Sequence, residues 1–191
     1  YGIGNLFLRD KESRLAGTDR ESMKTTALLF GLDLDYVSLT LPRIPCAEEA
    51  EKITALAELC SENFADYNAE RMARLIKKRM SSGEIFVIEH KNNIAGFIMF
   101  SKKNKTIDHI AVSPDYRRIG IASRLMVTAM AQFEVGEELS AVTFRQEHPM
   151  SDGVSRMYKK FGFDDEKNIV VRGEPLVKRT AVVPEKAIIT E

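Results

Sequence analysis

The sequence predicts one α/β (α+β) domain built on a central, mostly antiparallel sheet of about seven strands flanked by helices. Helical patterns fill most of the first 80 residues, and three strand patterns joined by short polar turns follow between residues 84 and 113. Strand and helix patterns then alternate up to residue 183. No internal repeat, low-complexity segment or linker interrupts this order, which therefore favours a single sheet with helices on its faces.

Composition is that of a globular chain with one sizeable core. The 191 residues are 44% hydrophobic and 29% charged. Lys and Arg number 28, and Asp and Glu also number 28, so the basic surplus on which nucleic-acid binding depends is missing. No apolar run approaches the ~20 residues that cross a bilayer, and no secretory signal pattern occurs, so we expect no membrane partner.

The two cysteines, Cys46 and Cys60, are too few for a disulfide framework. No Cys/His cluster has the spacing of metal ligands, so we expect no metal site. Two partly buried thiols fit a reducing compartment, and we expect the protein to be cytoplasmic.

The first elements precede the main run of strands. A capping box ahead of apolar residues at helical spacing predicts a helix over 19–30. Alternating β-branched residues predict a strand over 35–41, where two prolines follow. We therefore divide the chain into an N-terminal helical extension, 1–34, and a main domain, 35–191.

Two further helices are predicted over 47–64 and about 68–80, because apolar residues recur there at helical spacing. The other face of the second helix is strongly basic. It carries Arg71, Arg74, Lys77, Lys78 and Arg79. We expect this face to be solvated, and a docking site for an acidic partner is the alternative.

Three strands are predicted next, over 84–89, 94–101 and 106–113. The polar connections between them are short and contain Asn, which is typical of antiparallel hairpins. The remaining predicted elements are a helix over 120–133, a strand over 139–145, a helix over 152–161 and two strands within 167–183.

The junction between the strand over 106–113 and the helix that follows it has the character of an anion site. Gly120 and Ala122 keep side chains away from the point where the backbone enters the helix. Several N–H groups are then free to point at one spot, where the helix dipole adds positive charge. Arg117 and Arg118 bring full charges to the same rim, so a phosphate or pyrophosphate is the expected guest.

The segment from Ala111 to Ala122, AVSPDYRRIGIA, resembles the acetyl-CoA pyrophosphate loop of the GNAT N-acetyltransferase superfamily. That loop is usually written as a Val, a short Pro-containing turn and (Gln/Arg)-x-x-Gly-x-(Gly/Ala). A second segment, Val154 to Phe163, resembles the family's later helix, in which a Tyr precedes a Gly-Phe pair. The two segments occur in the family's order with one predicted strand between them.

The resemblance implies a GNAT-like fold and an N-acetyltransferase that moves an acetyl group from acetyl-CoA to an amine by direct attack. The family's sheet is splayed to admit the cofactor, here between Thr106–Val112 and Leu139–Arg145. The implied cofactor-binding residues are Ile110, Ala111, Val112, Arg117, Arg118, Ile119, Gly120, Ile121, Ala122, Ser123 and Ser151. The first three would pair with the pantetheine arm and the next seven would hold the pyrophosphate. Ser151 stands where many members have an Asn. The side chain of Ser is shorter than that of Asn and would make a weaker contact.

The resemblance also implies that Tyr158 is the general acid that protonates the departing thiolate. A phenol suits this role because its unperturbed pKa, ~10, keeps it protonated at neutral pH. For the general base we favour Asp108, which shares the strand parity of Ile110 and Val112. Glu147 or His148 in the following loop, or a water chain, are the alternatives. His109 points to the opposite face, where we expect it to pack or to hydrogen-bond.

The acceptor is expected to be an amine, on a small molecule or a protein. The carboxylates of Asp108 and Glu147 favour a cationic small amine. Family members are often dimers, so a homodimer is compatible with the resemblance. The alternative function is a catalytically inactive acyl-CoA-binding or regulatory GNAT-like module, and a purely structural protein is the third. Residues 1–34 would be a lid, a dimer contact or the tail of an upstream domain.

Overall fold

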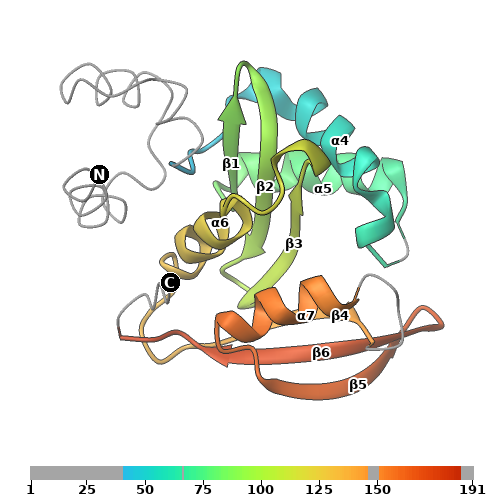
Figure 1. Ribbon diagram of the computed structural model, residues 1–191, viewed down its shortest axis with the longest axis vertical. Coiled ribbons are helices and arrows are strands. Elements are labelled where there is room, and N and C mark those ends of the chain that lie inside the picture. Colours follow the sequence, from blue (N-terminus) through green and yellow to red (C-terminus); the bar gives the residue numbers. More distant parts are fainter. Residues whose placement is uncertain (1–40, 66, 146–150, 186–191) are drawn as a thin grey trace.

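The computed structural model describes residues 41–65, 67–145 and 151–185 (Figure 1). Its helices are α4 (Ala50–Leu59), α5 (Ala69–Ser81), α6 (Ile121–Met130) and α7 (Ser151–Lys160). Its strands are β1 (Ile85–His90), β2 (Asn93–Ser101), β3 (Thr106–Val112), β4 (Glu138–Phe144), β5 (Asp165–Val171) and β6 (Glu174–Val182). Single 3-10 turns span Ala47–Glu49, Ser61–Asn63 and Pro114–Tyr116. Among these residues no helix is both long and apolar enough to cross a lipid bilayer.

The described strands form one sheet in the order β1-β2-β3-β4-β6-β5. All neighbours are antiparallel except β3 and β4, which are parallel, so the prediction of a mostly antiparallel sheet is confirmed. The described part of the chain contains six strands where about seven were expected. The difference lies at the predicted strand over 35–41, of which only Leu41 is described. Nearby, Arg43 makes an isolated antiparallel bridge with Val87 of β1.

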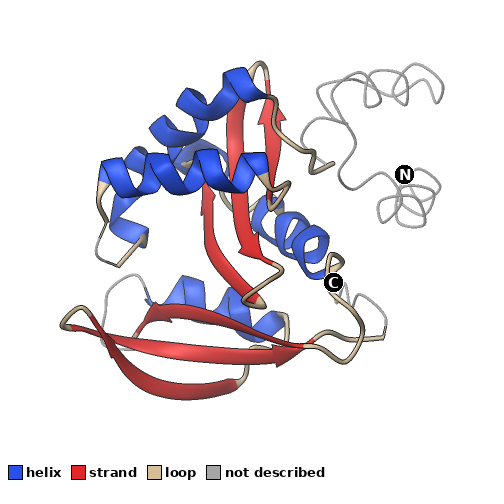
Figure 2. Ribbon diagram, turned by 180° about the vertical axis from the view of Figure 1, so that it is seen from behind, coloured by secondary structure: helices blue, strands red, loops and turns tan. Residues whose placement is uncertain are grey.

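Helices cover both faces of the first three strands (Figures 1 and 2). Apolar residues of α4 and α5, such as Ile53 and Ile76, pack on one face against Phe97 of β2. Helix α6 packs on the other face, where Leu125 joins a second core cluster with Phe100. Helix α7 lies beside β4, β6 and β5 in the lower part of the molecule in Figure 1. The predicted layering of helices around one sheet is therefore confirmed.

The sheet is split between β3 and β4, as the resemblance to the GNAT superfamily implied. Only two residue pairs join these strands, Thr106 with Ser140 and Ile107 with Ala141. Beyond Ile107 the two strands separate, so the edge of β3 that faces β4 is left without a strand partner. In the ribbon view, β4 and its neighbour α7 diverge from the three-stranded part of the sheet that β1, β2 and β3 form (Figure 1).

Several predictions need correction or lie outside the described residues. The predicted helix over 47–64 is divided by a break at Cys60, and α6 ends at Met130 rather than at residue 133. Arg79, predicted to lie on a solvated face of α5, is buried, with 7% of its surface exposed. The predicted helix over 19–30, with the loop residues Glu147 and His148, lies outside the described residues.

Candidate active site

A bulge in β3 lies at the point where the sheet splits. The pairing of β2 with β3 steps from Met99–His109 to Phe100–Ile107, so Asp108 is an extra residue without a partner on β2. The bulge breaks the alternation of side chains along β3. Asp108 consequently reaches α5 instead of sharing a face with Ile110 and Val112, and the predicted strand parity was wrong.

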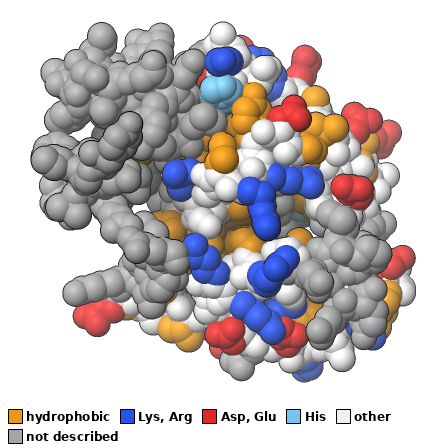
Figure 3. All heavy atoms as spheres, in the orientation of Figure 1, with side chains coloured by type: hydrophobic (Ala, Val, Ile, Leu, Met, Phe, Trp, Pro, Cys, Tyr) orange, Lys and Arg blue, Asp and Glu red, His pale blue; other side chains and the backbone are white. Residues whose placement is uncertain are grey.

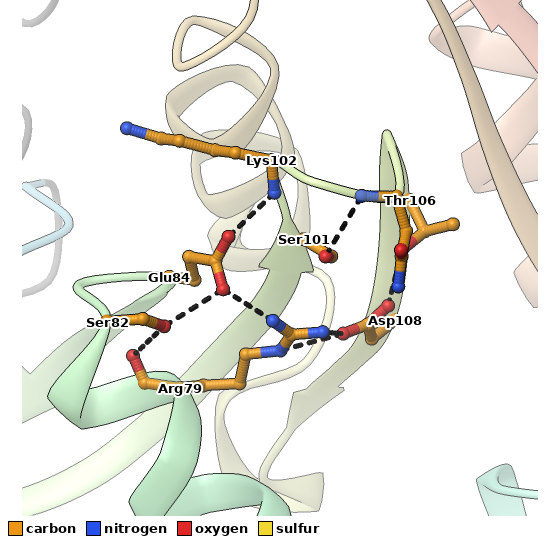
Figure 4. A network of polar contacts seen from close by, with 8 residues as sticks. Arg79, Ser82, Glu84, Ser101, Lys102, Thr106 and Asp108 are labelled. Atoms are coloured by element: carbon orange, nitrogen blue, oxygen red, sulfur yellow. Dashed lines mark hydrogen bonds and ion pairs between the residues drawn. The ribbon is translucent and has the colours of Figure 1, made fainter.

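The Asp108 carboxylate is held by Arg79 and Thr106 (Figure 4). Arg79 donates from Nε and Nη2 to Asp108 Oδ2 over 2.9 and 2.6 Å, and Thr106 Oγ1 donates to Oδ1 over 2.6 Å. On its other side Arg79 pairs with Glu84. Partial burial acts to raise the pKa of Glu84, but hydrogen bonds from the Lys102 amide, Ser82 and Arg79 bring it below its ordinary value. Arg79 therefore lies between two carboxylates, those of Asp108 and Glu84.

His109 packs on the α4–α5 side of the sheet, on the same side as the Asp108 carboxylate and not on the opposite face. Its ring meets that of Phe64 edge-on, with 5.1 Å between the centroids. Burial is the main cause that lowers the pKa of His109, so the imidazole is neutral at pH 7. Its Nδ1 atom is buried without a hydrogen-bond partner among the described residues.

A cavity of about 350 Å³ lies beside the bulge. Its lining comes from α5 and from the paired ends of β3 and β4. The lining residues are Leu75, Arg79, Thr106, Ile107, Asp108, His109, Ala141 and Val142. The cavity is thus a small open pocket at the base of the split, mainly apolar, with the polar side chains of Arg79, Asp108 and His109 in its lining.

Tyr158 approaches the split from α7. Its side chain is 4% exposed and belongs to the core cluster that includes Ile107 and Ala141. The ring packs edge-on against Phe163, with 5.2 Å between centroids. Burial, with a smaller contribution from the negative charge of Asp108, raises the pKa of the phenol well above its ordinary value, although Arg179 acts in the opposite direction. The hydroxyl therefore stays protonated throughout the neutral range.

Arg179 of β6 ties α7 to the sheet behind Tyr158. It is 2% exposed, and its Nε donates to Thr143 Oγ1 over 3.0 Å. It also donates to Ser155 Oγ on α7 and pairs with Glu166 of β5. The sequence pattern gave no sign of this role, because an Arg in a two-stranded ribbon is ordinarily exposed.

The turn between β3 and α6 has the free amides that its sequence predicted. Arg118 and Gly120 have positive φ values of 68° and 87°, and α6 begins directly after Gly120. The described part of the chain provides no hydrogen-bonded acceptor for the N–H groups of residues 118–123. Arg124 Nη1 donates to the Ile119 carbonyl over 2.9 Å, which steadies the turn from within. The arrangement suits a bound anion.

Basic side chains surround a hollow on this face of the molecule. In the orientation of Figure 1, the space-filling view shows Lys and Arg side chains at the rim and hydrophobic side chains at the floor (Figure 3). Arg117 and Arg118 are exposed in the turn between β3 and α6. Arg117 Nε also donates to the Val112 carbonyl over 3.3 Å, so it links the turn to the end of β3.

The structure brings most of the predicted residues to one opening. Residues 110–112 and 117–123 lie along the free end of β3 and the start of α6, and Ser151 is the first residue of α7. Asp108 lines the cavity at the base of the split, and Tyr158 belongs to the core cluster that includes Ile107, the neighbour of Asp108. Among the described residues no group of three or more His, Cys, Asp or Glu side chains is arranged to hold a metal ion.

Residues 81–165, which contain the split, the turn and Tyr158, match the family model of the acetyltransferase (GNAT) domain. Residues 81–165 are thus similar to a GNAT acetyltransferase domain. No curated protein has a sequence that matches this chain. The GNAT fold itself is well represented among solved structures.

Three solved structures illustrate the likeness. A GNAT-family acetyltransferase from Bacillus cereus is 17% identical, with a TM-score of 0.57 over 72% of this chain and 93% of that one. A ribosomal-protein-alanine N-acetyltransferase from Brucella melitensis is 15% identical, with a TM-score of 0.58 over 74% of this chain and 99% of that one. The Salmonella typhimurium protein yncA, solved with its cofactor acetyl-CoA, is 14% identical, with a TM-score of 0.55 over 78% of this chain and 96% of that one. At these identities the likeness is one of fold.

Proposed function

We propose that this GNAT domain transfers an acetyl group from acetyl-CoA to an amine. The observation that carries the proposal is the coincidence, at one split in the sheet, of an anion-binding turn and a buried phenol. A sheet that opens beyond Ile107 leaves room for an extended ligand beside β3. The turn before α6 would hold the charged end of that ligand, and Tyr158 would face its reacting end.

The donor would be bound mainly through backbone groups. The free N–H groups of residues 118–123 would receive the pyrophosphate of acetyl-CoA, with Arg117 and Arg118 beside them. The unpaired edge of β3 over 110–112 would pair with the pantetheine amides as a neighbouring strand would. The Salmonella protein, which was solved with acetyl-CoA, supports this choice of donor.

Tyr158 would act as the general acid. The amine nitrogen attacks the thioester carbonyl carbon, a C–N bond forms, and the C–S bond breaks with its electron pair left on sulfur. Tyr158 would give its proton to that sulfur, which is consistent with a buried phenol that is protonated at neutral pH. The amine must lose one proton in the same reaction, and a base or a water chain would take it.

Asp108 is the base that the sequence favours, and it lines the cavity in which an amine would wait. Its carboxylate would have to accept the proton while it holds Arg79 and Thr106. Glu147, His148 and water are the other groups that would serve. The acceptor itself would be a small molecule or a protein; the Brucella relative is named for a ribosomal-protein alanine.

A catalytically inactive acyl-CoA-binding module is the second candidate. It is favoured by the engagement of Asp108 in an ion pair and by Ser151 at the position where many family members have Asn. Such a module would use the same turn and the same split. We also propose that the protein is located in the cytoplasm and forms a homodimer.

Isothermal titration of acetyl-CoA tests the proposal first. We expect wild type to bind and a Gly120→Glu variant not to bind, because the new carboxylate would sit in the anion turn. Gly136→Glu is the matched control, since Gly136 has nearly the same φ, 86° against 87°, and has no atom within 4 Å of an added Cβ. Absence of binding by folded wild type would contradict the proposal. Binding without acetylation of a broad amine panel would favour the inactive module.

A further inference from the structure

Asp108 occupies the one place along β3 where two irregularities coincide. It is the extra residue of the bulge, and it directly follows Ile107, the last residue of β3 that pairs with β4. Its backbone is therefore held by neither neighbouring strand in register. A side-chain anchor is what would fix such a residue, and Arg79 of α5 provides one.

Building on the proposed function, we infer that Asp108 is a positioning residue: its ion pair with Arg79 fixes the bulge and so sets how β3 and β4 separate around the thioester. The proton acceptor for the amine is then another group. Arg79, which the sequence pattern placed in solvent, then contributes to the reaction by holding Asp108 and the bulge in place.

The contacts of the carboxylate support a structural role over proton transfer. Both oxygens already accept hydrogen bonds, two from Arg79 and one from Thr106. The side chains of Arg79 and Asp108 are only 9% and 16% exposed, so this pairing is made largely out of water. Protonating Asp108 would break one of the two ion pairs of the buried Arg79 and leave it with Glu84 alone, which is energetically costly.

Arg79 is itself held rigidly. Glu84, which pairs with it, accepts a hydrogen bond over 2.7 Å from the amide of Lys102 in the turn between β2 and β3 (Figure 4). The end of α5, the start of β1 and the β2–β3 turn thus converge on one guanidinium. Through Arg79 these three segments determine where Asp108, and with it the bulge, is placed.

The charged and titratable groups around this pair come from every neighbouring element. They are Arg71 of α5, Glu84 before β1, His109 of β3 and Tyr158 of α7. An acidic limb in the pH profile of kcat therefore has several candidate sources. Because Arg79 also lowers the pKa of His109 and of Glu84, movement of the limb on loss of Arg79 decides between the two roles only together with the value of kcat.

The two roles predict opposite results for an Arg79→Met variant. If Asp108 is the base, activity persists without the neighbouring cation and the acidic limb of the kcat profile moves to higher pH. If Asp108 positions the bulge, Arg79→Met and Asp108→Asn both lower kcat, by about 10²-fold, and the limb stays where it is. In that case the double variant is no slower than either single variant.

The experiment is a pH series of kcat and KM for the amine, with wild type, the two single variants and the double variant. Arg74→Met is the matched control, since Arg74 lies on the same helix, is 72% exposed and pairs only loosely with Glu70 at 3.6 Å. We expect the control to match wild type. Arg79→Lys keeps the charge without the two-pronged contact; if Arg79→Met does not fold, a lowered kcat with an unmoved limb in Arg79→Lys supports the inference. Near-wild-type kcat in the Arg79 variants with a shifted limb would overturn it.

Amide hydrogen exchange separates this inference from the proposed function, because it needs no substrate. We expect residues 106–112 to exchange at least tenfold faster in Arg79→Met than in Arg74→Met. Equal exchange in the two variants would overturn the positioning role even in an active enzyme. Failure of wild type to bind acetyl-CoA would instead overturn the proposed function.

Discussion

Gly96 of β2 lies directly beneath Ile121, the first residue of α6. A Cβ at position 96 would come within 2.8 Å of Ile121 Cγ2 and 3.0 Å of the Ala111 carbonyl oxygen. Such contacts are closer than real side chains tolerate, so the absence of a side chain lets α6 start close against the sheet. The free amides before and within the first turn of α6 owe their position to this contact.

Gly96→Ala should therefore weaken both the fold and the donor site. We expect a loss of about 1–3 kcal/mol in the free energy of unfolding, as is typical of overpacking, and a weaker affinity for acetyl-CoA. Gly153→Ala is the control, because no atom lies within 4 Å of its added Cβ. Urea unfolding and titration of acetyl-CoA measure the two effects, and unchanged affinity in a destabilised Gly96→Ala would separate the packing from the site.

The sequence predicted those parts of the site that are written in consecutive residues. Strand, turn and helix from Thr106 to Met130 follow from local patterns, as does the free-amide character around Gly120. The split between β3 and β4 came from the family resemblance and not from any local pattern. Gly96 carried a usable signal, since an isolated Gly inside a strand often marks a close approach.

The parts that escaped prediction depend on residues distant in sequence. Arg79 and Asp108 are 29 positions apart, and a cation on a helix surface looks solvated until its partner is known. The bulge is equally hidden, because an extra residue leaves no mark in a short apolar strand. Arg179 meets Ser155 across 24 positions. Buried ion pairs of this kind are determined by the tertiary fold.

Tyr158→Phe tests the general acid. We expect kcat to fall by roughly 10²-fold or more, while the affinity for acetyl-CoA changes little because the ring contact with Phe163 remains. Since burial raises the pKa of the phenol, loss of its proton should produce no basic limb in the kcat profile below about pH 10. Steady-state kinetics across pH check both points; an unchanged kcat would remove Tyr158 from the mechanism.

Acid should destabilise the fold through Glu49. Although burial acts to raise its pKa, hydrogen bonds from Arg43 and from the Cys46 amide bring it from 4.5 down to about 2. A carboxyl whose pKa is lower in the folded state than in the unfolded state stabilises the fold at pH values above its unfolded pKa. This stabilisation is lost as the pH falls from about 5 to about 2. The shift corresponds to about 3 kcal/mol.

Urea unfolding of wild type and Glu49→Gln between pH 7 and pH 2 measures this contribution. We expect the variant to be less stable than wild type at pH 7 and the difference to shrink as the solution is acidified. The bridge Arg43 Nη2–Glu49 Oε1 of 2.6 Å, with side chains 2% and 8% exposed, is the contact being removed. A difference that stays constant with pH would show that Glu49 acts through packing alone.

Arg179 and Lys159 both pair with Glu166, and their burial predicts very different consequences of removing them. Arg179 is 2% exposed and also holds Thr143 and Ser155, so Arg179→Met should lower the free energy of unfolding by about 3 kcal/mol. Lys159 is 56% exposed and 3.5 Å from Glu166, so Lys159→Met should change it by less than about 1 kcal/mol. Because Ser155 and Tyr158 share α7, Arg179→Met should also lower kcat. Thermal unfolding with kinetics below the melting temperature tests the pair; equal effects of the two substitutions would mean that the buried network does not hold α7 in place.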